Sequence, residues 1–397
     1  MTRPIRPFLF VPRYWPGLGG AELHSRRLAH ELARHVPIEV GRCCSTEEAP
    51  TDFAFATARA ARIEDGDVAV HTLAPAGAAR ALLSPLAKAA PKSRLARLLF
   101  ARAARAVITE PFRRLVGNAS IVHAIYNGFT PGAEALQSLG QPFVFTPLAH
   151  TTKPDGTAWS SPGFKHLYRK TDALIAMTEY EREWLIGQGA QSSRVHVCPM
   201  APLFESDVPD PVALRARFEL GEAPVILFLG RTAEYKGYRT LLDAASQIWA
   251  QQPEARLVFA GPVTPEAEVA FRSRPDPRII ITGTLSGADK KSVLAACDLL
   301  CVPSTEESLG VVFLEAWSFD KPVIAADIPA MRSVIEDGED GVLVRQDATA
   351  VATAITDLLG RPSRAKRMGQ QGARKVDAQY NWAAIADAHL RIYQSII

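Results

Sequence analysis

The sequence predicts an α/β protein with two Rossmann-like, doubly wound parallel sheets that face each other across a cleft. Its 397 residues exceed what one ordinary core accommodates, which favours two domains. Short apolar runs rich in β-branched residues alternate with amphipathic helical stretches. Most of these runs are continuously apolar, a pattern typical of parallel strands that are buried on both faces.

The first series of predicted strands belongs to a domain of residues 1–205. Its first run follows Arg3 and Arg6, as the apolar part of a secretory signal would, but it is short and lacks a small-residue cleavage site. We therefore interpret it as a buried strand. Helical stretches of crossover length separate many of the strands, as βαβ units require. The strands predicted here are Phe8–Val11, Ile38–Cys43, Val68–Leu73, Ala106–Thr109, Ile121–Ile125, Phe143–Thr146, Ala173–Met177 and Val195–Cys198.

The second series begins after a proline-rich break at residues 199–224 and defines a domain of residues 206–380. Because ligands bind at the carboxyl ends of strands in open parallel sheets, the two series together predict a binding cleft. The last segment, residues 381–397, is predicted to be a helix. The strands predicted in the second domain are Val225–Gly230, Arg256–Gly261, Arg278–Gly283, Leu299–Pro303, Pro322–Ala326 and Gly341–Arg345.

Composition and charge favour a cytoplasmic globular protein with two unlike halves. Residues 1–200 hold 24 Lys and Arg against 16 Asp and Glu, a balance of +8, and residues 201–397 hold 21 against 26, a balance of −5; the sum is the net +3. The five scattered cysteines favour reduced thiols over a disulfide framework or a metal site. No apolar run approaches the roughly 20 residues that span a bilayer.

A glycine-rich turn directly follows the first predicted strand. Gly19 and Gly20 let the backbone approach a ligand closely, at the start of a helix where phosphate is favoured. The order Gly-x-Gly-Gly differs from the dinucleotide fingerprint, and no acidic residue is well placed to hold an adenosine ribose. The turn is therefore either a phosphate site or simply a tight, well-packed turn.

Two cations lie in the loop after the first strand of the second domain. Arg231 and Lys236 fall between Gly230 and Gly237, at the carboxyl end of a buried strand and before a predicted helix. A forked guanidinium and a mobile ammonium together suit a diphosphate. The alternative is an ordinary solvated loop, where Arg and Lys are common.

The most specific motif is the segment Pro303–Ala316. A Ser-Leu-Gly turn in it opens an apolar helix, and Glu307 and Glu315 are eight positions apart, which would place both on one side of the same helix start. Glu315 is flanked by apolar residues, and a buried carboxylate needs partners. Sugar or ribose hydroxyls would serve; the alternative partner is an arginine of the same domain.

These three motifs together resemble the retaining glycosyltransferases of family 4, which have the GT-B fold. The resemblance runs from about residue 9 to 380 and is closer in the second half. The segments Asp320–Ala325 and Asp337–Val344 support it. Relatives often carry Gly-Gly-x-Pro-Glu where this chain has Asp327–Arg332, and Asn-Gly where it has Pro199–Pro202. Neither departure touches a residue proposed for the site.

The resemblance implies a role for each motif residue. The donor diphosphate would contact Arg231 and Lys236, with the first-domain glycines Gly19 and Gly20 closing over it. The backbone N–H groups of Ser308, Leu309 and Gly310 would support the phosphates and the sugar. Glu315 would bind the ribose, Glu307 a hydroxyl of the transferred sugar, and His150 would lie beside the reacting sugar, although it can also be an ordinary loop histidine. The last helix would cross back to the first domain.

The resemblance also implies a reaction. A hexose-type sugar would move, with retention and without a metal or other cofactor, from a nucleotide-diphosphate sugar to a glycan or lipid-linked glycan acceptor in polysaccharide assembly. An epimerase of GT-B-like fold and a non-catalytic sugar-nucleotide-binding protein are the alternatives. A phosphorylase would need a pyridoxal lysine, for which there is no signal. A double-displacement glycosidase is disfavoured because both glutamates lie beside a phosphate-type loop.

A basic stretch in the first domain suggests one further partner. Residues 88–114 contain eight Lys and Arg, a single acid, Glu110, and interleaved leucines. A basic amphipathic helix can rest on anionic lipid, which would add peripheral membrane association to the predicted cytoplasmic location. The alternative is a solvated surface helix. Binding of nucleic acid is disfavoured because no aromatic stacking platform accompanies the charge.

Overall fold

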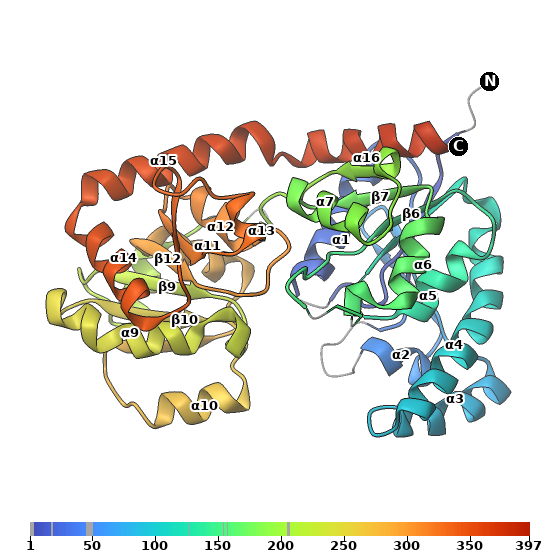
Figure 1. Ribbon diagram of the computed structural model, residues 1–397, viewed down its shortest axis with the longest axis horizontal. Coiled ribbons are helices and arrows are strands. Elements are labelled where there is room, and N and C mark those ends of the chain that lie inside the picture. Colours follow the sequence, from blue (N-terminus) through green and yellow to red (C-terminus); the bar gives the residue numbers. More distant parts are fainter. Residues whose placement is uncertain are drawn as a thin grey trace. The chain divides into compact units, whose positions relative to one another are not determined.

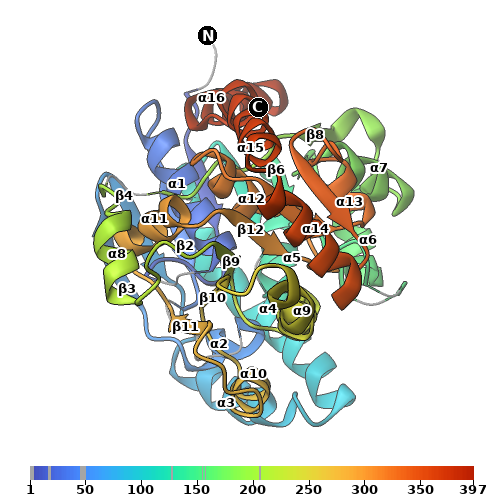
Figure 2. The same ribbon diagram turned by 90° about the vertical axis from the view of Figure 1, so that its left-hand side faces the viewer.

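The computed structural model describes residues 4–16, 19–44, 51–126, 128–153, 155–156, 158–204 and 207–397 (Figures 1 and 2). The chain forms two compact units. The first comprises residues 1–199 together with Trp382–Ile397, and the second comprises Met200–Asn381. In each unit a central parallel sheet is combined with helices, so the two Rossmann-like domains predicted from the sequence are confirmed.

The first unit contains an eight-stranded sheet in the order β3-β4-β2-β1-β5-β6-β7-β8. All neighbours are parallel except β3 and β4, which form an antiparallel edge. Phe10 of β1 lies opposite Gly41 of β2 on one side and Ala124 of β5 on the other. The strands are β1 (Pro7–Phe10), β2 (Glu39–Arg42), β3 (Ala61–Asp65), β4 (Val68–Thr72), β5 (Ile121–Ile125), β6 (Phe143–Thr146), β7 (Ala173–Ala176) and β8 (Val195–Val197).

Helices cover both faces of this sheet. On one face Phe8 and Phe10 of β1 pack against Phe112. On the other face His123 of β5 contacts Tyr393. The helices are α1 (Gly20–Ala33), α2 (Thr51–Thr57), α3 (Gly77–Ala89), α4 (Arg94–Leu115), α5 (Thr130–Gln137), α6 (Pro162–Lys170), α7 (Glu179–Gly187) and α16 (Trp382–Ile396).

One expectation for the first unit was wrong, and one strand was missed. The run Ala106–Thr109 is not a strand but lies within α4. Ile108 is buried together with Phe100, Ala104 and Phe112. This spacing of four residues is typical of the buried face of a helix. The edge strand β3 was not predicted, because its residues are mostly exposed and polar and therefore give no apolar run.

The second unit contains a six-stranded parallel sheet in the order β11-β10-β9-β12-β13-β14. Every strand predicted in this part of the chain is present. The strands are β9 (Val225–Leu229), β10 (Arg256–Ala260), β11 (Ile279–Gly283), β12 (Leu299–Val302), β13 (Val323–Ala326) and β14 (Gly341–Val344). The helices are α8 (Pro211–Arg217), α9 (Tyr238–Gln251), α10 (Pro265–Arg272), α11 (Gly287–Ala296), α12 (Val311–Trp317), α13 (Pro329–Arg332), α14 (Ala348–Gly360) and α15 (Pro362–Gln379). Across the described part of the chain, no helix combines the length and apolarity needed to cross a bilayer.

Helix α16 is bound to the first unit through a buried cluster of histidines. His123 of β5 lies 2.7 Å from the Tyr393 hydroxyl through Nδ1 and 2.7 Å from Thr146 Oγ1 through Nε2. His389 of α16 stacks beside His123, and its Nδ1 lies 2.8 Å from the Ile385 carbonyl oxygen. His24 of α1 is buried as well. Burial lowers the pKa of His24 to about 3 and that of His389 to about 4.

This cluster predicts loss of stability in acid. In the unfolded chain the imidazoles bind protons as the pH falls through about 6.5, whereas the buried rings remain neutral to a much lower pH. A histidine with a folded pKa of about 4 therefore costs the native state up to about 3 kcal/mol between pH 6.5 and 4. Urea unfolding at several pH values should show that His389→Gln reduces the slope of unfolding free energy against pH.

The matched control for that experiment is His35→Gln, because His35 is exposed. This control should leave the pH slope unchanged. An equal slope for wild type and His389→Gln would show that the buried cluster does not govern acid unfolding. The slope is the informative quantity, since the packing change alters stability equally at all pH values.

Candidate active site

The cationic loop of the second unit begins where β9 ends. Gly230 has φ 142°, and a Cβ atom on the facing Gly261 would lie 2.3 Å from the Gly230 carbonyl oxygen, so the two backbones touch. Arg231 follows and is exposed. Residues Glu234–Lys236 form a 3-10 turn, and helix α9 begins directly after Gly237. The predicted strand, loop and helix are therefore all present.

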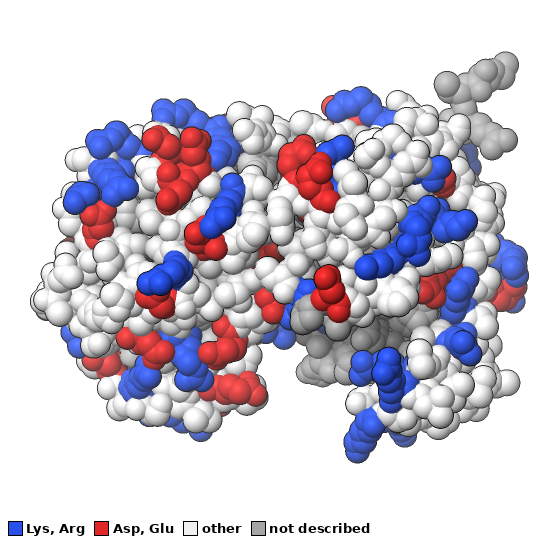
Figure 3. Space-filling model, viewed as in Figure 1, with Lys and Arg blue, Asp and Glu red and all other residues white. Residues whose placement is uncertain are grey.

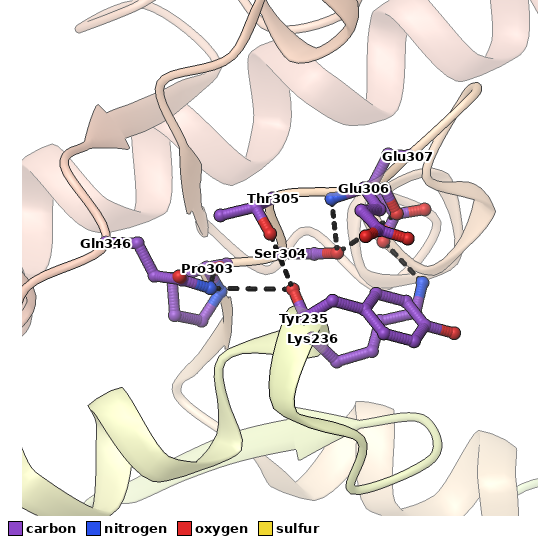
Figure 4. Close-up of polar contacts among 8 residues, drawn as sticks. All are labelled: Tyr235, Lys236, Pro303, Ser304, Thr305, Glu306, Glu307 and Gln346. Atoms are coloured by element: carbon purple, nitrogen blue, oxygen red, sulfur yellow. Dashed lines mark hydrogen bonds and ion pairs between the residues drawn. The ribbon is translucent and has the colours of Figure 1, made fainter. Parts of the chain in front are cut away.

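The segment after β12 lies directly against this loop (Figure 4). The Thr305 amide donates a 2.8 Å hydrogen bond to the Tyr235 carbonyl oxygen. Gln346, after β14, donates through Nε2 to the Pro303 carbonyl at 2.5 Å. Gly237 has φ 80°, and a Cβ atom there would lie 2.6 Å from the same carbonyl oxygen. A larger residue at Gly237 would therefore push the two segments apart.

Lys236 and Glu307 form the central contact between the two segments. Lys236 Nζ lies 2.6 Å from Glu307 Oε1, and Glu307 is only 7% exposed (Figure 4). Burial alone would lower the pKa of Lys236, but the negative charge and hydrogen bond of Glu307 outweigh it and raise that pKa. The ammonium is therefore firmly charged, and its two remaining N–H groups can still bind an anion.

The expected helical relation between Glu307 and Glu315 is wrong. Helix α12 begins only at Val311, so Glu307 lies in the preceding loop, with half-buried Ser308 and buried Leu309 after it. Gly310 ends this loop in the left-handed conformation, φ 71°, and a Cβ there would meet the Phe313 ring at 2.6 Å. The Ser-Leu-Gly turn does open the helix, as predicted, but a positive φ breaks the periodicity before it.

Glu315 is fully buried on helix α12. Its Oε1 accepts hydrogen bonds from Lys290 Nζ at 2.5 Å and from the Leu203 amide at 3.3 Å. If Glu315 had a partner within the protein, an arginine was expected from the sequence. The structure has Lys290 of α11 in that position instead. The second oxygen, Oε2, is buried and has no hydrogen-bond partner among the described residues. An acceptor atom left in this state is suited to a hydroxyl donor from a ligand.

The predicted site residues of the first unit come from two separate segments of the chain. Gly19 caps α1 in an extended conformation and Gly20 is the first helical residue, while Gly17 and Leu18 of the same turn fall outside the described residues. Glu22, in the first turn of the helix, is buried and ion-paired with Arg13. Gly19, Gly20 and His150 thus belong to the first unit, and the other seven predicted residues belong to the second.

His150 lies in a constrained loop after β6. Its ring stacks on Trp159 at 4.9 Å and 12°, and Trp159 Nε1 donates to the Pro147 carbonyl at 2.8 Å. Leu148 has φ 49°, which a non-glycine residue adopts only at a cost. The amides of Ala149 and Met177 each donate a 2.7 Å hydrogen bond to the buried carboxylate of Glu181, one to each oxygen. Glu181 therefore joins the histidine loop to the end of β7.

Glu181→Gln is expected to destabilise the protein in a pH-dependent way. Glutamine offers one acceptor where two amides need one each, so one buried amide loses its bond at a cost of about 1–3 kcal/mol. Burial raises the pKa of Glu181 to about 7, although the two amide bonds act in the opposite direction. The native carboxyl therefore stabilises the fold fully below about pH 4.5, and this contribution is lost as the pH rises to 7.

Chemical denaturation at pH 5 and pH 8 measures this prediction. The stability difference between wild type and Glu181→Gln should be larger at pH 5. Glu179→Gln is the matched control, since Glu179 lies on the same helix with its side chain 74% exposed. A difference between wild type and Glu181→Gln that is independent of pH would mean that the carboxyl does not titrate in this range.

Models of known families match both units. The model described as "Glycosyl transferase 4-like domain" matches residues 19–201, and "Glycosyl transferases group 1" matches residues 223–361. The D-inositol 3-phosphate glycosyltransferase of Rhodococcus jostii is 30% identical over 320 residues, which cover 72% of this chain and 69% of that protein. The chain belongs to the glycosyltransferase family.

Other relatives of this glycosyltransferase match over shorter regions. The α-D-kanosaminyltransferase of Streptomyces kanamyceticus is 30% identical over 242 residues, 58% of this chain and 62% of that protein. The corresponding match to the D-inositol 3-phosphate glycosyltransferase of Nocardia farcinica covers 55% of that protein at 31% identity. The chain thus spans somewhat more than half the length of these relatives.

Solved structures share the whole fold of the glycosyltransferase. HepE of Anabaena, in complex with UDP and glucose, superimposes with a TM-score of 0.75 at 17% identity and covers 98% of this chain and 100% of its own. The sucrose-phosphate synthase of Thermosynechococcus elongatus gives 0.74 at 19% identity, covering 98% of each chain. These similarities establish the GT-B architecture of two Rossmann-like domains.

Several residues of the site were not predicted from the sequence. Gln346 and Lys290 reach the site from distant strands and helices, and no local pattern marks them. Glu181 does carry a signal, because Thr178 and Glu181 have the spacing of a helix capping box. No group of three or more His, Cys, Asp or Glu side chains within the described ranges is arranged to hold a metal ion.

Proposed function

We propose that this glycosyltransferase transfers a hexose-type sugar from a nucleotide-diphosphate donor to a glycan or lipid-linked acceptor, and that its second unit binds the donor. The observation that carries this proposal is Glu315, a fully buried carboxylate with one oxygen lacking a partner among the described residues. Ribose hydroxyls would supply the missing hydrogen bonds. HepE, which shares the fold, was solved with UDP-glucose, in keeping with a donor of this class.

In this proposal the cations of the β9 loop bind the diphosphate. Lys236 keeps Glu307 on one N–H group and directs the others to phosphate oxygens. Exposed Arg231, in the same loop, adds a bidentate donor. As the anomeric bond ionises, negative charge grows on the departing diphosphate, and these two cations stabilise it. Gly19 and Gly20 of the first unit are proposed to contact the same diphosphate.

The carboxylates orient the sugar nucleotide. Glu307, held in place by Lys236, accepts a hydrogen bond from a hydroxyl of the transferred sugar, and Glu315 fixes the ribose. The amides of Ser308, Leu309 and Gly310 lie in the loop between these two carboxylates and would donate to the phosphates and the sugar. His150 of the first unit is proposed to contact the reacting sugar. Fixing the donor at several points aligns the anomeric carbon for attack.

The reaction we propose proceeds with retention and without a metal. The donor forms an oxocarbenium-like centre, the acceptor hydroxyl attacks from the face that the diphosphate leaves, and a phosphate oxygen accepts the acceptor's proton. Arg231 and Lys236 provide the positive charge that a metal would otherwise supply. Undiminished turnover in excess EDTA would support a reaction without a metal. A product bond with the same anomeric configuration as the donor would support retention.

A thermal-shift screen with UDP, GDP, ADP, TDP, CMP and NAD tests the donor class first. A ligand at about a hundred times its dissociation constant stabilises the fold by roughly 2.7 kcal/mol. We expect one nucleoside diphosphate to raise the melting temperature. A shift with NAD alone would contradict the assignment of the Gly19–Gly20 turn.

Product formation then distinguishes transfer from the other classes. Nucleoside diphosphate should be released from the corresponding sugar nucleotide only when an acceptor is supplied. Conversion of the sugar nucleotide without an acceptor would identify an epimerase. A thermal shift with no turnover across glycan and lipid-linked acceptors would favour a binding protein without catalysis.

A further inference from the structure

The exposed face of helix α3 is apolar. Its buried residues, Leu83 and Ala87, occupy one side. The opposite side would be polar in a helix that only covers a sheet. The exposed residues of α3 are Gly77, Ala78, Ala81, Leu82, Pro85, Lys88 and Ala89. Lys88 is the only polar side chain among them, and Leu82 is 56% exposed.

Helix α4 continues this surface with leucines at its first turns. Leu95, Leu98 and Leu99 are 67%, 56% and 45% exposed, although the helix buries Phe100, Ala104, Ile108 and Phe112 on its opposite side. Leu95, Leu98, Leu99 and Arg102 are spaced three to four residues apart, so they share one face. The buried side of α4 already supplies the contacts with the core, so these exposed leucines are not needed there.

The charged side chains on α3 and on the first turns of α4 are all basic. Residues 68–109 contain no Asp or Glu. Five cations on or between the two helices form no ion pair with any described residue: Lys88, Lys92, Arg94, Arg97 and Arg102. Farther along α4, by contrast, Arg113 and Arg114 are both paired with Glu110. Charge and exposed leucines therefore coincide at one end of the helix pair.

This end of the first unit has the character of a membrane-binding surface. Figure 3 shows Lys and Arg side chains at its lower right, where Figure 1 places α3 and α4, with white surface between them. The solvent-facing side of a helix is normally polar, and a nucleic-acid-binding surface does not require exposed leucines, so neither function explains these four. Leucines that enter the acyl region and cations that remain at headgroup depth fit an anionic bilayer.

We infer that the leucine–cation surface of α3 and α4, comprising Leu82, Leu95, Leu98, Leu99 and the five unpaired cations, docks the protein on anionic lipid. The surface holds the enzyme at a bilayer without spanning it. This inference concerns lipid binding alone and does not require the proposed reaction. It would also bring the protein to acceptors that are anchored in the same bilayer.

Vesicle co-sedimentation tests this inference. Wild type should bind vesicles containing phosphatidylserine and not vesicles of phosphatidylcholine alone. Leu95→Asp combined with Leu98→Asp should weaken binding by about tenfold or more, because both apolar contacts are lost and negative charge is added. The matched control is Val212→Asp with Val269→Asp, two side chains of the second unit that are 77% and 66% exposed. The control should bind like wild type.

A second comparison of two double variants tests the electrostatic contribution to lipid binding. Arg94→Gln with Arg97→Gln should weaken binding, and about 1 M salt, where the Debye length is about 3 Å, should weaken it in wild type. Arg113→Gln with Arg114→Gln removes the same charge from the same helix but at residues already paired with Glu110, and should have a smaller effect. Equal effects of the two pairs would show that binding is not localised to this surface.

Three outcomes would overturn the inference. The first is equal sedimentation with neutral and anionic vesicles. The second is binding of a duplex DNA or RNA that depends on the arginines while vesicles are not bound. The third is a dimer in sedimentation velocity that the leucine variants convert to monomer, since the surface would then contact a second copy. Unchanged melting temperatures without ligand in every variant establish that each one is folded and keep this test separate from that of the reaction.

Discussion

Lys236→Ala is expected to reduce turnover by about 100- to 1,000-fold, the typical effect of removing one group that stabilises developing negative charge. The ammonium lies 2.6 Å from Glu307 and is the less exposed of the two cations in the β9 loop. In the proposed mechanism its loss would leave the departing diphosphate with Arg231 as its remaining cation. Glu307 also loses its ion-pair partner, which we propose orients it toward the sugar. Initial rates at saturating donor, together with a melting curve, measure the effect.

The control for this variant is Lys366→Ala, which removes an exposed lysine of α15 in the same unit. Lys366→Ala should retain the wild-type rate. Lys236→Arg should recover part of the activity, because the charge returns while the geometry differs. A near-wild-type rate for Lys236→Ala in a folded protein would remove Lys236 from the proposed diphosphate site.

Glu315→Gln is expected to lower kcat/KM by about two orders of magnitude. A hydrogen bond to a charged group contributes about 1.5–3 kcal/mol, and the substitution weakens the bonds that Oε2 would make to ribose hydroxyls. Because binding energy at the ribose helps to align the reacting sugar, part of the loss should appear in kcat and not only in KM. Steady-state kinetics over a range of donor concentrations separate the two.

A second variant separates the ribose contact from the protein contact. Glu315 also binds Lys290 and the Leu203 amide through Oε1, so its loss disturbs the unit itself. Lys290→Gln removes that ion pair but leaves the Glu315 carboxylate in place. If Glu315 binds the ribose, Lys290→Gln should retain clearly more activity than Glu315→Gln at equal melting temperature. The reverse order would assign Glu315 a structural role alone.

The fold was predictable because a parallel strand that is buried on both faces appears in the sequence as a continuous apolar run. Runs such as Val225–Gly230 are apolar at every position, and only a strand covered on both faces needs that. The same rule failed at Ala106–Thr109, where a short apolar run belongs to a helix that buries every fourth residue. It also missed β3, whose side chains are mostly exposed and whose place in the sheet depends on pairing with β4.

The site was predictable only where its residues are close in the sequence. The loop from Gly230 to Gly237 and the turn before α12 each carry their own glycines, so their conformations could be inferred locally. The contact of Lys236 with Glu307 joins residues 71 positions apart, and motif resemblance alone brought them together. The left-handed Gly310, which places Glu307 outside the helix, is invisible to an argument from helical spacing.

The division of the chain between the units has a consequence for biosynthesis. The second unit is one continuous segment, Met200–Asn381, whereas the first unit includes Trp382–Ile397, whose His389 and Tyr393 lie in its interior. Domains generally fold in the order in which they leave the ribosome. Here the unit that is translated first is completed last. It lacks α16 until the whole of the second unit has been made. During that interval the nascent first unit exposes His123 and its apolar neighbours, and this is the stage at which a chaperone would have most to bind.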